Sequence, residues 1–384
     1  MNASSDELQA VAAPLHRAVA AIDLGAIERN CARLVAGLAE GAALCAVVKA
    51  DGYGHGAADS AAAAVRGGAS WLAVSSATEA WELRPRLEQV PILTMGALTG
   101  AELDVALQAA SDLTVWRAGF LAEVAERGEQ LGLRPRVHVK HDTGMGRLGE
   151  PDPEAATALV KAAAADARVE LVGAWTHFAT ADEPDGTYFD EQLRRFRDFV
   201  EPLKAEFPQL IAHAANSAAT IRDRSSHFDL VRCGIAIYGL DPLNIDPAPR
   251  NLEPALELRS YVAAVKRFEA GASAGYGRTW TAPSVTDVAV IPIGYGDGVA
   301  RALSNHGEVL IGARRFPLVG TVSMDNLTVD LGLDSGVEPG DPVVFIGTQA
   351  EEQILAEDVA SRLETINYEV TCRISARVSR TYSR

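Results

Sequence analysis

Hydrophobic residues follow an alternating pattern from about residue 25 to residue 235. β-rich runs of five to seven residues alternate with stretches whose apolar residues recur at helical spacing, such as residues 25–38 and 118–131. Strands that alternate with helices form parallel sheets. Eight such units in about 215 residues favour a TIM-type (β/α)8 barrel, with an open doubly wound α/β sheet as the alternative. The predicted strands cover residues 43–48, 71–76, 91–96, 112–116, 136–140, 169–175, 210–214 and 229–234.

The pattern changes after about residue 250, where β-rich segments with Gly and Pro turns replace the alternation. In this part only residues 354–364 have a clear helical spacing. We therefore predict a mainly β C-terminal domain over residues 251–384, after a barrel over residues 17–250 and a flexible tail over residues 1–16. Residues 17–24 are candidates to pair with the second domain.

Composition narrows the class of protein. The 384 residues are 48% hydrophobic and carry a formal net charge of −16, which argues against a nucleic-acid or membrane partner. The four cysteines lie far apart, as expected of ordinary buried thiols in a reducing compartment rather than of a disulfide framework or a zinc site. We find no signal peptide and no long apolar run in the sequence, and therefore expect a cytoplasmic protein.

Polar residues lie where several predicted strands end, which is the end of a barrel that carries the active site. Singly, each is more often a structural residue than a functional one, and only their coincidence at one rim points to a site. The set comprises Lys49 and Tyr53 after the first strand, Lys140 and Arg147 after the fifth, His177 after the sixth, His213 on the seventh and Arg232 on the eighth.

An anion is the ligand that the last two units favour. Ser217 opens a helix, and Gly234 and Ile235 supply backbone N–H groups after strand eight, where barrels commonly hold a phosphate. A phosphate together with a lysine that can form an imine indicates pyridoxal 5'-phosphate (PLP). The motif "GYGHGA" also fits a dinucleotide fingerprint, but the next strand lacks the acid that binds ribose. We expect no metal site, because no clustered Cys/His or H-E-x-x-H motif is present.

Nine motifs together resemble one known family. They are "AVVKADGYGHG", "HDTGMGRLG", "THFATAD", "NSAAT", "VRCGIAIYG", "AGYGRTW", "IPIGYGDG", "VGTVSMDN" and "NYEVTCRISARVSR". In this order they resemble alanine racemase, a fold-type III PLP-dependent amino acid racemase. The resemblance covers the chain from about residue 17 and implies a (β/α)8 barrel followed by a β domain.

The resemblance also implies a role for each matching residue. Lys49 would form the covalent bond to PLP and act as one catalytic base, and Tyr276 would be the second. Arg147 and the backbone N–H of Met324 would bind the substrate carboxylate, while Lys140 matches a lysine that is often carbamylated. Asp182, Tyr295, Arg301 and Ile366 would line the entrance. The implied cofactor-binding set is Lys49, Tyr53, His177, His213, Ser217, Arg232, Gly234, Ile235 and Tyr368.

The implied activity is the interconversion of L- and D-alanine, for peptidoglycan synthesis or for alanine catabolism. In the family Tyr276 comes from the partner subunit, so the resemblance implies a head-to-tail homodimer with shared active sites. His141, Ser323 and Asn326 depart from the usual residues, which leaves a broad-specificity or serine racemase as an alternative. A fold-type III decarboxylase is disfavoured, because Arg232 stands where such an enzyme would place a carboxylate.

Overall fold

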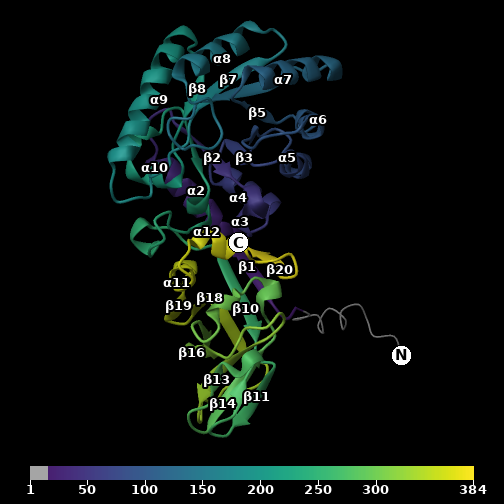
Figure 1. Ribbon diagram of the computed structural model, residues 1–384, viewed down its shortest axis with the longest axis vertical. Helices are drawn as coiled ribbons and strands as arrows, with labels where there is room; N and C mark the ends of the chain where they lie inside the picture. Colours follow the sequence, from purple (N-terminus) through teal and green to yellow (C-terminus); the bar gives the residue numbers. More distant parts are fainter. Residues whose placement is uncertain (1–15) are drawn as a thin grey trace, which may run out of the picture. The chain divides into compact units, whose positions relative to one another are not determined.

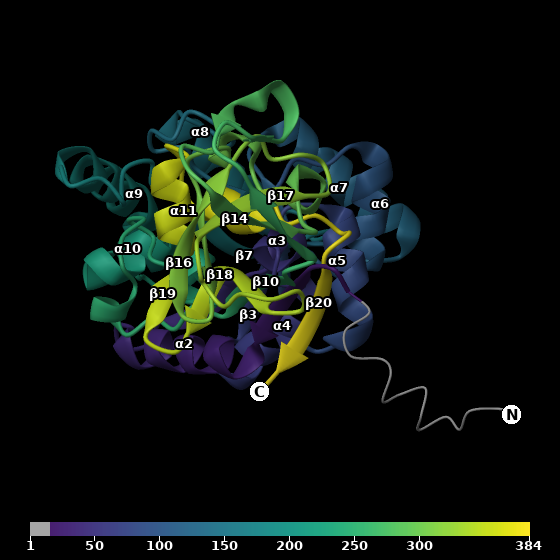
Figure 2. The ribbon, with the colours of Figure 1, turned by 90° about the horizontal axis from the view of Figure 1, so that it is seen from below.

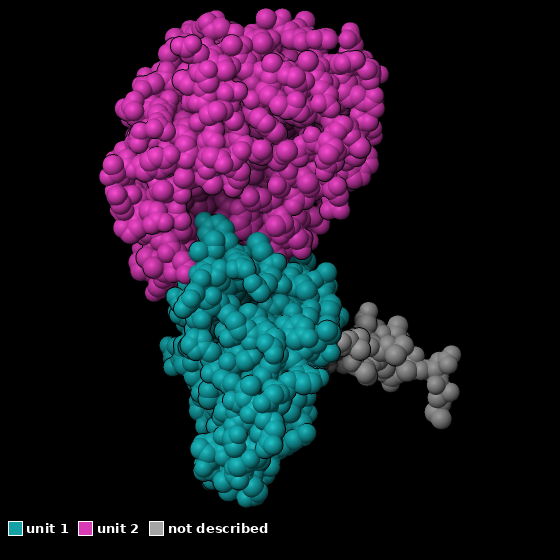
Figure 3. Space-filling view, in the orientation of Figure 1, with its two compact units in different colours: residues 1–23, 254–384 teal, residues 24–253 magenta. Residues whose placement is uncertain are grey.

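Two compact units make up the chain (Figure 3). The computed structural model describes residues 16–384, so the predicted tail lies outside the described residues apart from His16. Of the described residues, unit 1 combines residues 16–23 with residues 254–384, and unit 2 comprises residues 24–253. Residues 16–23 therefore belong with the C-terminal third of the chain.

Unit 2 is an eight-stranded, nearly closed parallel barrel, which confirms the predicted fold class. Its strands follow the order β8-β7-β6-β5-β4-β3-β2-β9, and each neighbouring pair is parallel. All eight predicted strands are present. Their bounds are β2 Ala43–Val47, β3 Trp71–Val74, β4 Ile92–Thr94, β5 Asp112–Val115, β6 Arg136–Lys140, β7 Glu170–Trp175, β8 Ile211–His213 and β9 Leu230–Cys233.

Helices cover the outside of the barrel, as Figure 1 shows for α5 to α9. Local sequence explains several of their starts, because a capping side chain bonds the first free N–H groups. Ser76 with Glu79 and Thr99 with Glu102 form capping boxes for α5 and α6, and Asp152 caps α8. The helices are α2 Leu24–Gly37, α3 Lys49–Tyr53, α4 Ala57–Arg66, α5 Ala77–Leu83, α6 Gly100–Gln108, α7 Ala118–Leu131, α8 Pro153–Ala165, α9 Thr187–Glu206 and α10 Ser217–Arg222.

Unit 1 is built on a ten-stranded sheet that joins the two ends of the described chain. Strand β1 (Val19–Asp23) pairs antiparallel with β10 (Leu256–Tyr261) and parallel with β20 (Ser379–Ser383), the strand that leads to the C-terminus in Figure 2. The other strands are β11 Ala264–Phe268, β14 Thr286–Ile291, β15 Glu308–Ile311, β16 Arg314–Val319, β17 Leu327–Gly332, β18 Pro342–Gln349 and β19 Glu352–Ile354.

Short elements complete unit 1. Strands β12 (Ser273–Ala274) and β13 (Trp280–Thr281) form a small hairpin of their own. Helices α11 (Ala356–Arg362) and α12 (Asn367–Cys372) lie between β19 and β20 in the chain. Among residues 16–384, no helix is both long enough and apolar enough to cross a membrane.

Candidate active site

Lys49 begins a strained turn directly after strand β2. The next three residues, Ala50, Asp51 and Gly52, have φ between 51° and 61°, and Tyr53 has φ 55°. A left-handed turn is costly for residues other than glycine, roughly 1–2 kcal/mol each. Polar contacts hold it in place, because Glu79 Oε1 accepts the Ala50 N–H at 2.7 Å and the Asp51 carboxylate accepts the Ala57 N–H at 3.0 Å. Such strain is typical of functional sites.

The turn brings Tyr53 to Gly234, directly after the end of strand β9. A Cβ atom added at Gly234 would lie 2.3 Å from Tyr53 Oη, so the glycine gives the phenol room to approach the backbone. Ser217 Oγ accepts the N–H groups of Gly234 at 3.0 Å and Ala236 at 3.4 Å. Three of the residues predicted to hold an anion therefore meet here, with Ile235 between the two N–H donors.

Arg232 is the central buried cation of unit 2, with only 2% of its surface exposed. Its Nη2 donates to the carbonyls of Thr176 (2.8 Å) and Ala214 (3.0 Å), and its Nη1 lies 2.9 Å from His213 Nδ1. Its Nε is buried and has no hydrogen-bond partner among the described residues. A buried donor without a partner is costly, so this N–H is suited to a ligand that brings an acceptor.

Other cations gather around Arg232. Lys140 Nζ and Arg232 Cζ lie 4.4 Å and 4.6 Å from the centre of the Trp175 ring, at cation–π distance. Burial, together with the charges of Arg232, Arg147 and Lys49, lowers the pKa of Lys140 to about 7, although Asp142 acts against the shift. Burial and the same cations hold the pKa of His177 well below its usual value. The cluster is therefore suited to anionic groups.

The loop that carries Arg147 is shaped by one carboxylate. Asp142 accepts the backbone N–H groups of Gly144 (2.9 Å), Met145 (2.7 Å) and Arg147 (3.1 Å). Burial of Asp142 acts against ionisation, but these hydrogen bonds hold its pKa below the usual range. Asp182, a predicted entrance residue, lies exposed in the loop after β7.

The remaining predicted residues lie in unit 1. Tyr276 starts the short helix η5 (Tyr276–Arg278) and has 74% of its surface exposed. Its backbone carbonyl accepts a hydrogen bond from the Thr321 hydroxyl at 2.8 Å. Tyr276, Thr321 and Ser323 line one shallow cavity with Gly275 and Asn326. Tyr295, Met324 and Ile366 are also exposed large hydrophobic residues, and Arg301 is exposed, whereas Tyr368 is half-buried in α12. Exposed side chains of this size are suited to contact a ligand or another surface.

Two neighbouring turns carry Tyr295 and Met324. The Tyr295 N–H donates to the Ser323 carbonyl, and the Gly296 N–H donates to the Met324 carbonyl, each at 3.0 Å. A Cβ atom at Gly294 would lie 2.2 Å from the Ser323 carbonyl oxygen, so only glycine allows this approach. The two turns therefore form one rigid edge of unit 1.

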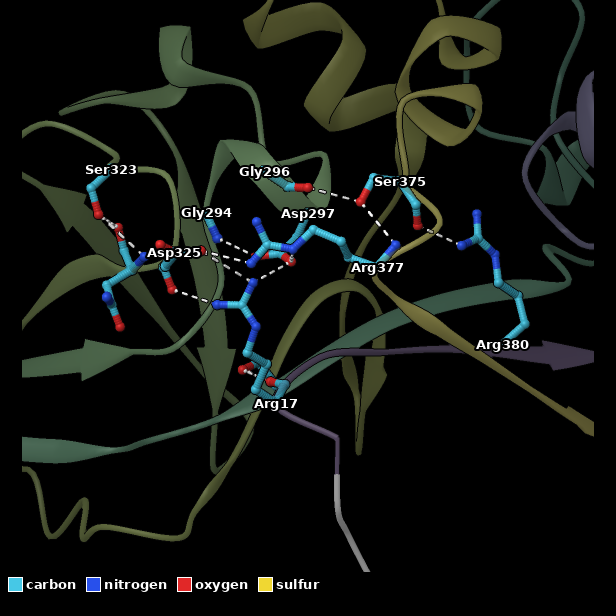
Figure 4. Close-up of polar contacts among 11 residues, drawn as sticks. Arg17, Gly294, Gly296, Asp297, Ser323, Asp325, Ser375, Arg377 and Arg380 are labelled. Atoms are coloured by element: carbon cyan, nitrogen blue, oxygen red, sulfur yellow. Dashed lines mark hydrogen bonds and ion pairs between the residues drawn. The ribbon is translucent and has the colours of Figure 1, made fainter.

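Four charged side chains fix this edge (Figure 4). Asp297, which is 1% exposed, accepts Arg17 Nη2 at 2.6 Å and the Gly294 N–H at 2.9 Å, and lies 3.4 Å from Arg377 Nε. Arg377 Nη2 also donates to Asp325 Oδ1 at 2.6 Å. Because Asp325 follows Met324, the two arginines connect the Met324 turn to both ends of the described chain.

Comparisons with known proteins identify the family. The sequence profile described as "Alanine racemase, N-terminal domain" matches residues 22–242, and the profile "Alanine racemase, C-terminal domain" matches residues 255–382. The chain belongs to the alanine racemase family. It is 41% identical over 371 residues to alanine racemase of Frankia casuarinae, which covers 95% of this chain and 96% of that protein. It is 39% identical over 365 residues to alanine racemase 1 of Bacillus subtilis, with 94% and 92% covered.

Solved alanine racemases share the fold. The enzyme from Streptomyces lavendulae, a producer of D-cycloserine, superposes with a TM-score of 0.90 at 38% identity and covers 97% of this chain and 98% of that chain. The Bacillus anthracis enzyme with bound L-Ala-P gives a TM-score of 0.89 at 36% identity, with 97% and 96% covered. The alanine racemase family consists of PLP-dependent isomerases.

The residues of unit 2 fit this cofactor. The buried Arg232 Nε can donate to a ring nitrogen, the cluster of Tyr53, Ser217 and Gly234 can hold a phosphate, and Lys49 supplies a primary amine. No group of three potential metal ligands occurs within residues 16–384.

Three residues in and around this site were not predicted from the sequence. They are Glu79, which holds the Lys49 turn, Trp175, which contacts Lys140 and Arg232, and His138, which lies 2.9 Å from His213. Trp175 precedes the predicted "THFATAD" motif, and His138 lies two residues before Lys140 on the same strand. Strand alternation alone could have placed His138 on the same face as Lys140.

Proposed function

We propose that this protein interconverts L- and D-alanine with PLP, using Lys49 and Tyr276 as bases on opposite faces of the substrate. One observation carries the proposal: in a chain of this family, Lys49, an anion cradle and the unpaired Nε of Arg232 belong to the same barrel rim. Racemisation removes the proton from Cα on one face and returns a proton on the other. Two bases meet that need, and a single lysine meets it poorly.

The residues of the barrel bind and orient the reactants. Bound PLP supplies an aldehyde that condenses with an amine and a conjugated ring that accepts electron density as the Cα proton leaves. Arg147, in the cationic cluster, binds the substrate carboxylate, and the Met324 N–H binds the same group. Arg232 would donate to the ring nitrogen, and because a guanidinium cannot accept a hydrogen bond, that nitrogen would stay unprotonated. A less strongly electron-accepting ring disfavours side reactions such as decarboxylation.

Tyr276 acts as a base only in its phenolate form, which a nearby cation or a hydrogen bond to the phenolate oxygen would stabilise. Replacing this tyrosine with phenylalanine should lower kcat by about 10²- to 10⁴-fold, the usual contribution of a general base.

We also propose a head-to-tail homodimer in which Tyr276 of one subunit completes the site of the other. The proposal is supported by family membership and by the 74% exposure of Tyr276. Mixing inactive Lys49→Ala with inactive Tyr276→Phe should restore part of the activity in heterodimers. A mixture that stays inactive after proven subunit exchange would contradict shared sites.

The proposed setting is the cytoplasm, with D-alanine supplied for peptidoglycan or alanine consumed in catabolism. Cys31, Cys45 and Cys233 are buried as predicted, whereas Cys372 is exposed. No disulfide bond joins any of the four, which agrees with a reducing compartment. The activity is tested by incubating the purified protein with PLP and L-alanine or L-serine in D2O. We expect loss of the alanine Cα–H signal with growth of the D-enantiomer, and much slower exchange with serine. Faster exchange with serine would contradict alanine as the preferred substrate.

A further inference from the structure

Four buried polar side chains form a continuous line inside the barrel, from Arg232 to Asp112. Arg232 Nη1 lies 2.9 Å from His213 Nδ1, and His213 Nε2 lies 2.9 Å from His138 Nδ1. His138 Nε2 lies 3.1 Å from Asp112 Oδ2. The four residues come from β9, β8, β6 and β5, and each is at most 2% exposed. Arg232 and His213 belong to the implied cofactor-binding set, whereas His138 and Asp112 have no role assigned so far.

The fold is built to accommodate this line. A Cβ atom at Gly173 of β7 would lie 2.5 Å from His138 Nδ1, so the glycine leaves room for the imidazole ring. The other oxygen of Asp112 accepts Arg136 Nε at 2.8 Å. Although burial alone would raise the pKa of Asp112, hydrogen bonds from His138 and Arg136 hold it below its usual value. Asp112 is therefore a carboxylate.

The two ends of the line determine where every proton lies. A guanidinium only donates, so His213 Nδ1 accepts and its proton is on Nε2. His213 then donates to His138 Nδ1, and His138 donates from Nε2 to the Asp112 carboxylate. A doubly protonated His138 is excluded. It would force His213 to accept hydrogen bonds on both nitrogens, and a neutral imidazole has only one acceptor nitrogen. Burial and the Arg232 charge also lower the pKa of His213 well below its usual value, which keeps that ring neutral.

We propose that Asp112 and His138 are positioning residues of the racemase. Through His213 they fix Arg232 as a donor, with its Nη groups paired and its Nε–H left for the cofactor ring nitrogen. Asp112 also makes each imidazole a better acceptor for the group before it, which stabilises the guanidinium charge. That the Nε–H of Arg232 donates to a cofactor ring nitrogen rests on the proposed function, whereas the positions of the protons on the two histidines do not depend on it.

Replacing Asp112 with asparagine should reverse the direction in which the two histidines donate their hydrogen bonds. Arg136 Nε only donates, so the amide oxygen stays toward Arg136 and the amide NH2 turns toward His138 Nε2. His138 must then carry its proton on Nδ1 and donate to His213 Nε2. His213 in turn carries its proton on Nδ1, directly facing an N–H of Arg232. Two donors then oppose each other at the residue that orients the cofactor ring.

The tautomers can be read directly from protein labelled with 15N-histidine. NMR of the imidazole nitrogens distinguishes a protonated from an unprotonated nitrogen, and the chain has 8 histidines. We assign the two signals with His138→Gln and His213→Gln. His227 is an internal reference, because its Nδ1 accepts the Ala39 N–H and its Nε2 lies 2.9 Å from the Thr220 carbonyl. Its proton is therefore on Nε2 in every variant.

In the wild-type protein we expect His138 and His213 to be neutral, with the proton on Nε2. In Asp112→Asn both should carry the proton on Nδ1, while His227 is unchanged. Asp104→Asn is the matched control, since Asp104 pairs with Arg127 and touches neither histidine. It should keep the wild-type tautomers.

The PLP-loaded enzyme provides a second readout. Asp112→Asn should lower kcat about tenfold, as loss of a supporting hydrogen bond commonly does, and should shift the visible absorbance of the bound cofactor. Asp104→Asn should change neither. A wild-type His213 with its proton on Nδ1 overturns the proposal, even if Asp112→Asn does not fold. A variant with reversed tautomers but unchanged kcat and spectrum overturns the positioning role. The expected tautomers in a protein that does not racemise alanine would instead contradict the proposed function.

Discussion

Lys140 should react with carbon dioxide. Its pKa of about 7 results from burial and from the charges of Arg232 and Arg147. At pH 8 such an amine is about 90% uncharged, whereas a lysine at the reference pKa of about 10.4 is uncharged in roughly 0.4% of molecules. The form that adds CO2 is therefore about 200-fold more abundant. The resulting carbamate places an anion next to Arg147 and Arg232, which offsets the positive charge of these two side chains.

The carbamate can be measured by 13C NMR with labelled bicarbonate at pH 8. We expect one stoichiometric carbamate signal in the wild-type protein and none from this site in Lys140→Met. Lys161→Met is the control, because Lys161 is half exposed and paired with Glu206. Since protonation of Lys140 opposes the reaction, the signal and kcat should fall as the pH is lowered through about 7, and bicarbonate should restore part of the activity. An active wild-type enzyme without the signal, or an equal signal in Lys140→Met, would refute the reasoning.

Three further results are expected. Gly234→Ala places a methyl group 2.3 Å from Tyr53 Oη, so the dissociation constant of PLP should rise at least about tenfold, whereas Gly37→Ala, which enters open space, should leave it unchanged. Asp297→Asn weakens the ion pairs with Arg17 and Arg377, which are partly exposed, so the free energy of unfolding in a denaturant titration should fall by about 2–3 kcal/mol. The same variant should raise KM for alanine. An unchanged KM would show that the turns of Tyr295 and Met324, which Asp297 holds, do not bind substrate. A thiol reagent should modify one exposed cysteine in the native protein, and Cys372→Ser should abolish the reaction, because the other three thiols are buried and burial raises their pKa values.

The barrel could be predicted because its signals are local. Each strand is a short apolar run, and helices are indicated by the helical spacing of apolar residues and often by a capping residue such as Ser76 or Thr99. The polar residues at the carboxyl ends of the strands follow from the same pattern, since parallel strands bring those ends to one rim.

The line from Asp112 to Arg232 could not be predicted, because it depends on register between strands. His138 and His213 are 75 residues apart, and a register shift between Val137 and His138 alters the pairing of β6 with β7. The left-handed turn after Lys49 could not be predicted from the sequence either. Gly52 and Gly54 permit it, but Ala50 gives no local reason for a positive φ, and only the distant Glu79 explains how it is held.

The pairing of β1 with β10 and β20 has a consequence for how the chain is made. During synthesis β1 leaves the ribosome first, yet its partners lie in the last third of the chain. At about 5–20 residues per second, roughly 10–50 seconds pass before β10 emerges. The barrel can fold during that time as an insertion between two parts of one sheet, while β1 remains an unpaired edge. A truncation that begins at the barrel would therefore leave a β domain that lacks the strand between β10 and β20.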